Sequence, residues 1–182
     1  DAPFANPRNA AAGILRRLDP SEAESIRFAV TFYDATGIDT ENAPGQRELL
    51  EALRDREIPM GVLSNKVDSI TQEIVRVLLG ESYFVHIQGS HPEIPKKPDP
   101  TAPRVVAEAM DVSAEQCIFV GDSSMDMEAA VAAEMTPVGV SWGYRWAEEL
   151  RGAGAVTIID HPLELLQMFE PVTAGSKEGE EQ

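Results

Sequence analysis

From about Gly45 onward, two hydrophobic patterns alternate along the chain. Stretches with apolar residues three or four positions apart predict amphipathic helices, and short apolar runs between them predict buried strands. The helices are expected over residues 46–56, 68–79, 101–110, 125–134, 145–151 and 162–169. The strands are expected over residues 58–63, 84–88, 117–120, 137–140 and 156–159. Strands that alternate with short helices predict an α/β fold, in this case a Rossmann-like parallel sheet with crossover helices.

The two ends of the chain lack this alternation. The pattern divides the chain into an N-terminal helical segment over 1–37, a core over 38–170 and an acidic tail over 171–182. Residues 175–182 contain no apolar side chain that could be buried, so we expect the tail to be disordered. The chain begins with Asp1 rather than Met, which favours a fragment or a processed product.

Charge and cysteine content narrow the class of protein. Acidic residues outnumber basic ones by 31 to 15, which gives a net charge of −16. A protein of this charge repels a nucleic-acid backbone, so non-specific nucleic-acid binding is not expected. An anionic small substrate would need a local positive site and a divalent cation. The single cysteine, Cys117, lies in an apolar run, which indicates a buried residue, excludes a disulfide framework and favours a reducing, cytoplasmic location. No apolar run is long enough to cross a membrane, and no signal peptide is visible.

Polar residues follow several of the predicted strands, where parallel sheets bind their ligands. The Ser64 hydroxyl and the backbone N–H of Asn65 could bind a phosphate oxygen, although this pair is also common in turns and helix caps. Lys97 lies in the proline-rich loop 91–100, and the prolines restrict the loop so that a lysine can be directed at a phosphate as a point charge. Its neighbour Lys96 is expected to be solvated.

Two aspartates follow the strand predicted at 117–120. Gly121 allows the chain to leave the strand sharply, and Asp122 and Asp126 lie four positions apart around a predicted helix start. Carboxylates at this spacing could both face a Mg²⁺ ion that keeps several waters. They could equally cap the helix and stabilise its dipole.

In this order, the three elements resemble motifs two, three and four of the haloacid dehalogenase (HAD) superfamily, and the flanking sequence resembles its phosphoglycolate-phosphatase-like branch. The resemblance extends over roughly residues 27–169. It implies a Mg²⁺-dependent phosphatase that acts on a small phosphorylated metabolite, with neither nucleic acid nor a membrane as partner. It also implies roles for the residues. Ser64 and the Asn65 amide would bind the phosphoryl group, Lys97 would neutralise its charge, and Asp122 and Asp126 would hold Mg²⁺.

The resemblance does not extend to the family's nucleophile motif. HAD enzymes begin with a strand that ends in Asp-x-Asp-x-Thr, whose first aspartate attacks phosphorus and whose second protonates the leaving group. No Asp-x-Asp occurs before Ser64. In one interpretation, a helix capped at Ser21 runs through Tyr33, and the first strand and most of the family's cap domain are truncated or absent. In the other, 28–33 is the first strand, Asp34 is the nucleophile and its degenerate motif provides no general acid. The capping signal and the family match favour the helix.

The first residues carry a second resemblance. Residues 4–20 are similar to a segment of the adenylation domain of bacterial NAD-dependent DNA ligases. The adenylated-lysine motif of those enzymes, Lys-x-Asp-Gly, is absent from the chain, so ligation does not follow. A fusion, a chimeric sequence, chance and a simple cap helix over 9–18 are all open interpretations.

The sequence therefore favours a HAD-type phosphatase that hydrolyses a small, phosphoglycolate-like phosphomonoester, with a missing or degenerate nucleophile motif. The alternative is a non-catalytic HAD-like domain that binds phosphate or Mg²⁺ without turnover. Neither the substrate nor the oligomeric state can be predicted from these patterns.

Overall fold

The computed structural model describes residues 29–30 and 45–169. The predictions for the N-terminal segment, including the ligase-like residues, and for the acidic tail concern residues outside these ranges. Asp34 and its possible motif also lie outside the described residues.

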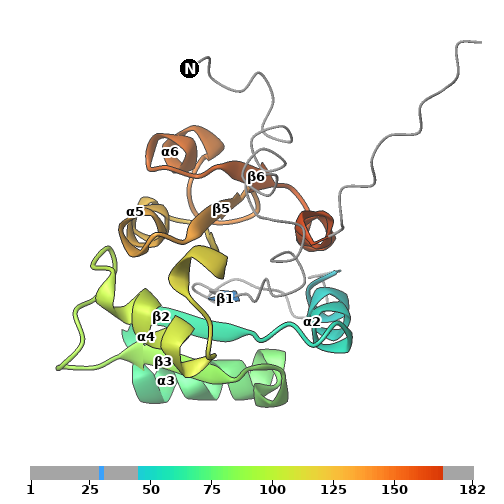
Figure 1. The fold of residues 1–182 in the computed structure, drawn as a ribbon, viewed down its shortest axis with the longest axis vertical. Coiled ribbons are helices and arrows are strands. Elements are labelled where there is room, and N and C mark those ends of the chain that lie inside the picture. Colours follow the sequence, from blue (N-terminus) through green and yellow to red (C-terminus); the bar gives the residue numbers. More distant parts are fainter. Residues whose placement is uncertain (1–28, 31–44, 170–182) are drawn as a thin grey trace, which may run out of the picture.

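Parallel strands form the centre of the described part (Figure 1). One sheet contains, in hydrogen-bonded order, β1 (Ala29–Val30), β4 (Ile118–Gly121), β5 (Thr136–Val140) and β6 (Thr157–Ile159). A second sheet pairs β2 (Gly61–Val67) with β3 (His86–Ser90), again in parallel. Because β1 also lies against β2, the strands follow one another in space as β3, β2, β1, β4, β5 and β6. The predicted α/β fold with a parallel sheet is confirmed.

Helices cover both faces of these strands. They are α2 (Gln46–Asp55), α3 (Asp68–Ile74), α4 (Thr101–Ala109), α5 (Ser124–Ala133) and α6 (Ala147–Gly152). The α3 segment continues as a π-helix over Val75–Leu79, and the chain closes with a 3₁₀ helix over Pro162–Met168, where an α-helix was expected. In Figure 1, α2 and this closing helix lie on one side of β4 and β5, and α5 and α6 lie on the other.

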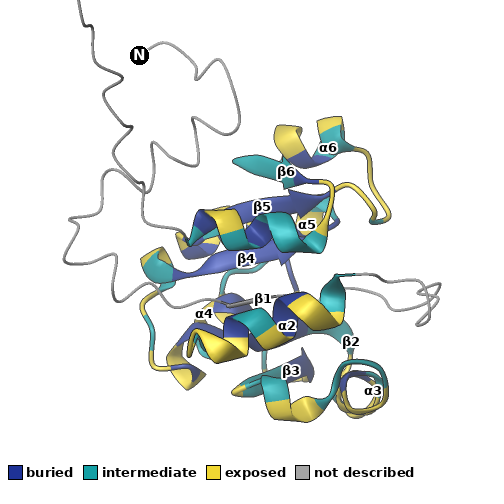
Figure 2. Cartoon of the chain, turned by 90° about the vertical axis from the view of Figure 1, so that its right-hand side faces the viewer, coloured by how far each residue is buried: buried dark blue, intermediate teal, exposed yellow. Residues whose placement is uncertain are grey.

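The hydrophobic core consists of two clusters, because the central strands are buried on both faces (Figure 2). Ile118 and Val120 of β4 pack with α2 and the closing helix in the first cluster. Phe119 and the neighbouring Cys117 pack with α4 and α5 in the second. Successive residues of a strand point to opposite faces, so a continuous apolar run is what a doubly covered strand requires.

A second expectation is also wrong within the described residues. The preferred interpretation placed a helix through Tyr33, but Ala29 and Val30 form β1 and pair in parallel with Phe119 and Val120 of β4. The gap between β2 and β4 would leave backbone groups unpaired on both neighbours, and a strand fills it. Tertiary pairing therefore overrides the local capping signal. The β-branched and aromatic residues that surround Val30 in the sequence were the signal for a strand.

None of the helices in the described ranges is both long and apolar enough to span a membrane.

Candidate functional site

The site lies where β2 and β4 end, on either side of β1. Leu63 of β2 pairs with Gln88 of β3, and the next pair joins Val67 with Ser90, so Ser64 to Lys66 form an irregular bulge opposite a single residue of β3. Bulges of this kind redirect side chains beside functional sites. Since parallel strands end at the same edge of a sheet, the bulge and the end of β4 face one another.

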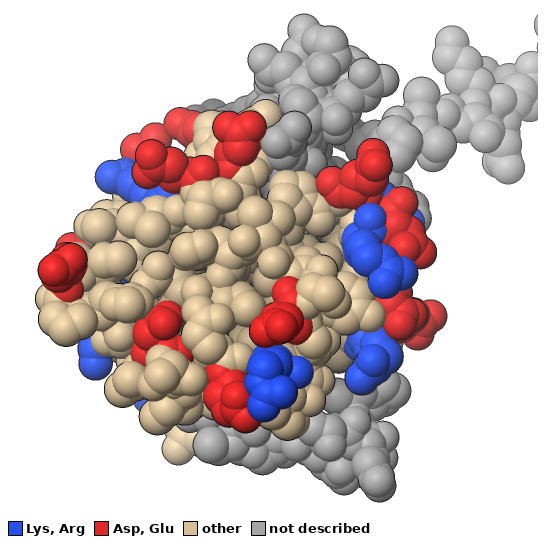
Figure 3. Space-filling view, turned by 90° about the horizontal axis from the view of Figure 1, so that it is seen from below, with Lys and Arg blue, Asp and Glu red and all other residues tan. Residues whose placement is uncertain are grey.

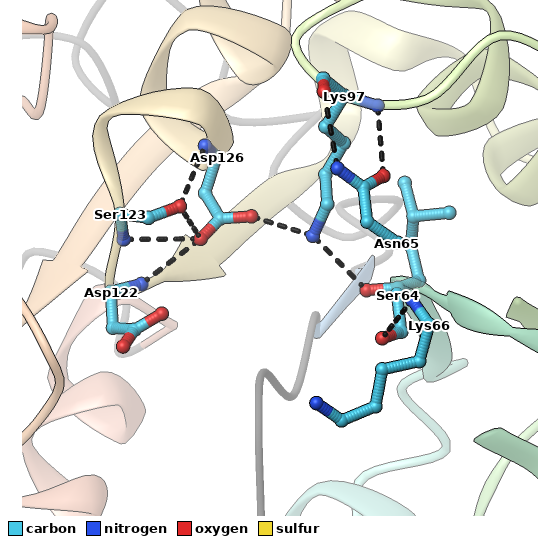
Figure 4. Close-up of polar contacts among 8 residues, drawn as sticks. Ser64, Asn65, Lys66, Lys97, Asp122, Ser123 and Asp126 are labelled. Atoms are coloured by element: carbon cyan, nitrogen blue, oxygen red, sulfur yellow. Dashed lines mark hydrogen bonds and ion pairs between the residues drawn. The ribbon is translucent and has the colours of Figure 1, made fainter. Parts of the chain in front are cut away.

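Lys97 reaches this edge from the proline-rich loop. Its side chain is only 7% exposed, whereas Lys96 is exposed, as expected for a solvated lysine. The Lys97 ammonium donates to the Leu63 carbonyl oxygen at 3.3 Å and to a carboxylate oxygen of Asp126 at 2.6 Å. It also lies 5.8 Å from the centre of the Phe119 ring. Figure 4 shows the ammonium between Asp126 on one side and the end of β2 on the other.

Asp126 is held at the start of α5 by its own helix cap. Oδ2 accepts hydrogen bonds from the Ser123 hydroxyl at 2.6 Å, the Ser123 N–H at 3.1 Å and the Asp122 N–H at 3.3 Å (Figure 4). Ser123 Oγ in turn accepts from the Asp126 N–H, which completes a capping box. Because Oδ1 binds Lys97, both oxygens of this 2% exposed carboxylate are engaged within the protein.

Asp122 follows β4 directly and is only 3% exposed. Its Oδ2 accepts a hydrogen bond from the Tyr144 N–H at 2.7 Å, and no described residue hydrogen-bonds to Oδ1. The pKa of Asp122 is raised to about 6, mainly by burial and to a smaller extent by the nearby Asp126 carboxylate. The Tyr144 N–H and the Lys97 ammonium oppose these effects. The carboxylate therefore has one oxygen available to a ligand and is destabilised in its ionised, unliganded form.

Two glycines leave room for the side chains of Asp126 and Asp122. A Cβ at Gly121 would lie 2.4 Å from the Cβ of Asp126, and a Cβ at Gly143 would lie 2.2 Å from the Cβ of Asp122. Contacts that short do not occur, so any side chain at Gly143 would displace either Asp122 or the loop that provides the Tyr144 N–H.

Ser64 lies in the bulge on the opposite side of the site. Its Oγ accepts a hydrogen bond from the Lys66 N–H at 3.1 Å, and no described residue accepts its hydroxyl proton. A hydroxyl has one donor and two acceptor positions, so the Ser64 proton can be donated to a ligand oxygen without breaking this bond.

Figure 3 shows basic and acidic side chains interspersed over one face, without a broad basic patch among the described residues in that view. In the site itself, the Lys97 ammonium is a buried positive charge that could bind an anionic ligand.

The donor set allows a magnesium ion but does not form a complete protein cage. No group of three or more His, Cys, Asp or Glu residues suited to a metal occurs within 29–30 and 45–169. Mg²⁺ is often held by only one or two carboxylates, with waters and substrate phosphate completing its shell. The free Oδ1 of Asp122 fits this requirement, whereas both oxygens of Asp126 already have partners.

The predicted site residues within the described ranges thus converge. Lys97 and Asp126 are in direct contact, Asp122 is hydrogen-bonded through its backbone to Asp126, and Ser64 adjoins Leu63, which binds the Lys97 ammonium. Two functional contacts had no signal in the sequence. They are the bonds from the Asn65 side chain to the Lys97 backbone and the Tyr144 N–H that binds Asp122.

Comparison with known proteins gives consistent matches. Residues 9–140 match the family model described as haloacid dehalogenase-like hydrolase. The phosphoglycolate phosphatase of Pseudomonas putida is 30% identical over 156 residues, which cover 84% of this chain and 57% of that protein. The Escherichia coli phosphoglycolate phosphatase is 34% identical over 107 residues, which cover 59% of this chain and 42% of that protein. The chain thus spans about half the length of these relatives.

Solved structures agree. A haloacid dehalogenase-like family hydrolase from Streptococcus pneumoniae superimposes with a TM-score of 0.62 at 27% identity, covering 68% of this chain and 57% of that one.

Proposed function

Since the chain belongs to the haloacid dehalogenase-like hydrolase family, we propose that it hydrolyses a small phosphomonoester by Mg²⁺-assisted phosphoryl transfer. The observation that carries this proposal is the buried Lys97 ammonium, 2.6 Å from Asp126 and bordered by the ends of β2 and β4. A buried lysine with one carboxylate partner, beside a free serine hydroxyl and a second buried carboxylate, is suited to an anion with a counter-ion. The names of the relatives favour a phosphoglycolate-like substrate.

Each residue has a proposed role in binding the phosphoryl group. The Ser64 hydroxyl and the Asn65 backbone N–H would donate to its oxygens, and Lys97 would neutralise charge that develops on them. Asp122 would bind Mg²⁺ through its free Oδ1. Asp126, the second predicted metal ligand, would act mainly by holding Lys97, because its own oxygens are engaged.

Magnesium would supply charge neutralisation for the phosphate and the attacking group. The buried and destabilised carboxylate of Asp122 supports this assignment, because a cation would relieve the cost of its ionisation.

Asp34 is the proposed nucleophile. Val30 of β1 is opposite Val120, two residues before Asp122, and Asp34 follows Val30 by four residues. Four residues span at most about 14 Å, so the chain length permits the carboxylate to reach the site. The carboxylate would attack phosphorus, the ester P–O bond would break, and the leaving alkoxide would take a proton from water, because the motif provides no general acid. A second water would then hydrolyse the aspartyl-phosphate, which releases inorganic phosphate and restores the Asp34 carboxylate.

Turnover assays test the proposal directly. The full chain should hydrolyse p-nitrophenyl phosphate and 2-phosphoglycolate in Mg²⁺, and EDTA should abolish the activity. Lys97→Ala should lower turnover by at least tenfold, and the matched control Lys96→Ala should not, because Lys96 is exposed and outside the site. Absence of turnover with both esters would refute the enzyme proposal.

The alternative, a non-catalytic binding domain, predicts a different experimental result. If phosphate and Mg²⁺ together raise the melting temperature while turnover remains absent, the chain is a binding domain. The cytoplasmic location expected from the single cysteine also stays a prediction.

A further inference from the structure

We propose that the side chain of Asn65 is a positioning residue that fixes the Lys97 ammonium in the site. This role is distinct from phosphate binding by the Asn65 backbone, and it rests on the proposed phosphatase function. The two residues are separated by 32 positions, yet they are joined by a pair of hydrogen bonds (Figure 4).

The pair is complementary in both directions. Asn65 Nδ2 donates to the Lys97 carbonyl oxygen at 3.1 Å, and the Lys97 N–H donates to Asn65 Oδ1 at 2.9 Å. A carboxamide carries one donor and one acceptor group in a single plane, so it can bind the N–H and C=O of one residue as a neighbouring β-strand does. A carboxylate or a hydroxyl of similar size could not supply both bonds in this arrangement.

These bonds matter because they complete the fixation of Lys97. Its ammonium binds the carbonyl oxygen of Leu63, two residues before Asn65, so the end of β2 holds both the backbone and the tip of the lysine. Asp126 holds the ammonium from the side of α5. A lysine stem has four rotatable bonds, and tethering both of its ends removes most of that freedom.

The expected consequence is a loss of rate more than of binding. A point charge must lie at the place where negative charge develops, and a displacement of about 1 Å from a mutation can cost roughly 100-fold in rate. In Asn65→Ala, the backbone of Lys97 loses its two hydrogen bonds to β2, but all the charged groups remain. We expect kcat to fall roughly 10- to 100-fold while KM changes less than about threefold.

A double-mutant cycle separates positioning from direct contact or general destabilisation. The Lys97→Ala variant keeps the backbone N–H and C=O that Asn65 binds, but it has no ammonium to position. Asn65→Ala should therefore lower kcat in the wild-type background and have no further effect on kcat in the Lys97→Ala background. Equal losses in both backgrounds would overturn the proposal, because Asn65 would then act independently of the lysine.

Gln72→Ala provides the matched control. Gln72 donates one carboxamide hydrogen bond to the Ile87 carbonyl at 2.8 Å, but it lies on α3 and this bond goes to β3 rather than to a site residue. It should change kcat by less than about twofold, as expected for a surface substitution.

A second measurement keeps the inference testable if the wild-type chain shows no turnover, an outcome that would refute the proposed function alone. In NMR spectra of protein with ¹³C-labelled lysine, the two Lys97 Hε protons should have separate shifts and slow reorientation, as an anchored side chain requires. Asn65→Ala should merge or broaden these signals, and Gln72→Ala should not. Unchanged Lys97 signals in Asn65→Ala would refute the positioning role.

Discussion

Replacing Asp122 by asparagine should stabilise the metal-free protein at pH 8. Burial raises the pKa of this carboxyl from 3.8 to about 6, so the ionised form is disfavoured in the folded state. One pKa unit corresponds to about 1.4 kcal/mol, so the buried charge costs about 2–3 kcal/mol at pH 8. Asparagine removes the charge and keeps an oxygen that can accept the hydrogen bond from the Tyr144 N–H. A gain of this size corresponds to roughly 5–10 °C in melting temperature.

The stability gained by Asp122→Asn depends on pH, because the wild-type carboxyl is charged only at higher pH. A carboxyl whose pKa is raised on folding favours the folded state fully below its unfolded pKa near 4, and this contribution is lost as the pH rises through about 6. The advantage of Asp122→Asn should therefore be full above pH 7, about half as large at pH 5 and close to zero below pH 4.

Urea denaturation in EDTA at pH 8 and pH 5 measures this difference. Asp160→Asn, an exposed carboxylate that follows β6, is the control and should have no effect beyond about 0.5 kcal/mol. Added Mg²⁺ should then stabilise the wild type but not Asp122→Asn. An asparagine variant that is no more stable than the wild type at pH 8 would refute the account of a buried, destabilised carboxylate.

Three further substitutions or reactions test other parts of the structure. Lys97→Ala should destabilise the fold by about 3–5 kcal/mol in urea denaturation, because the Asp126 carboxylate is then buried without its cation. The control Lys96→Ala should change the stability by no more than about 0.5 kcal/mol. Equal effects of the two substitutions would contradict the buried ion pair. Gly143→Ala should lower turnover at least tenfold in a protein that still folds, while Gly152→Ala, where an added Cβ meets nothing within 4 Å, should keep full activity in the same assay. Cys117, whose thiol pKa is raised by burial to about 12, should resist iodoacetamide at pH 8 until denaturant is added, and rapid labelling of the native protein would show that the thiol is accessible.

The sequence predicted the helices and strands of residues 45–169 well because the hydrophobic pattern of this part of the chain matches the burial of its elements in the fold. The central strands β4 and β5 are short apolar runs buried on both faces, and α2 and α4 each carry an apolar stripe. The main error, at Val30, arose where a local capping signal conflicted with strand pairing. A two-residue pairing depends on what lies on either side in space, and the sequence does not contain that information directly.

The candidate site was predictable as a set of residues but not as a set of contacts. Ser64, Lys97 and Asp122 follow strands or lie between prolines, and parallel topology brings such positions to one edge. The different contacts of Asp122 and Asp126 could not be predicted from the sequence. Asp126 is engaged by a capping box and by a lysine 29 residues away, and Asp122 is held by a backbone N–H 22 residues away. Contacts over such separations appear only after the chain has folded.

Anomalous diffraction from crystals of the full chain with Mn²⁺ and inorganic phosphate tests most directly whether one pocket binds both ions. We expect a metal peak about 2.1 Å from the Asp122 carboxylate, and a phosphate whose oxygens accept hydrogen bonds from the Ser64 hydroxyl and the Lys97 ammonium. Metal and phosphate bound elsewhere, or no occupancy between β2 and β4 at saturating concentrations, would contradict the proposed site.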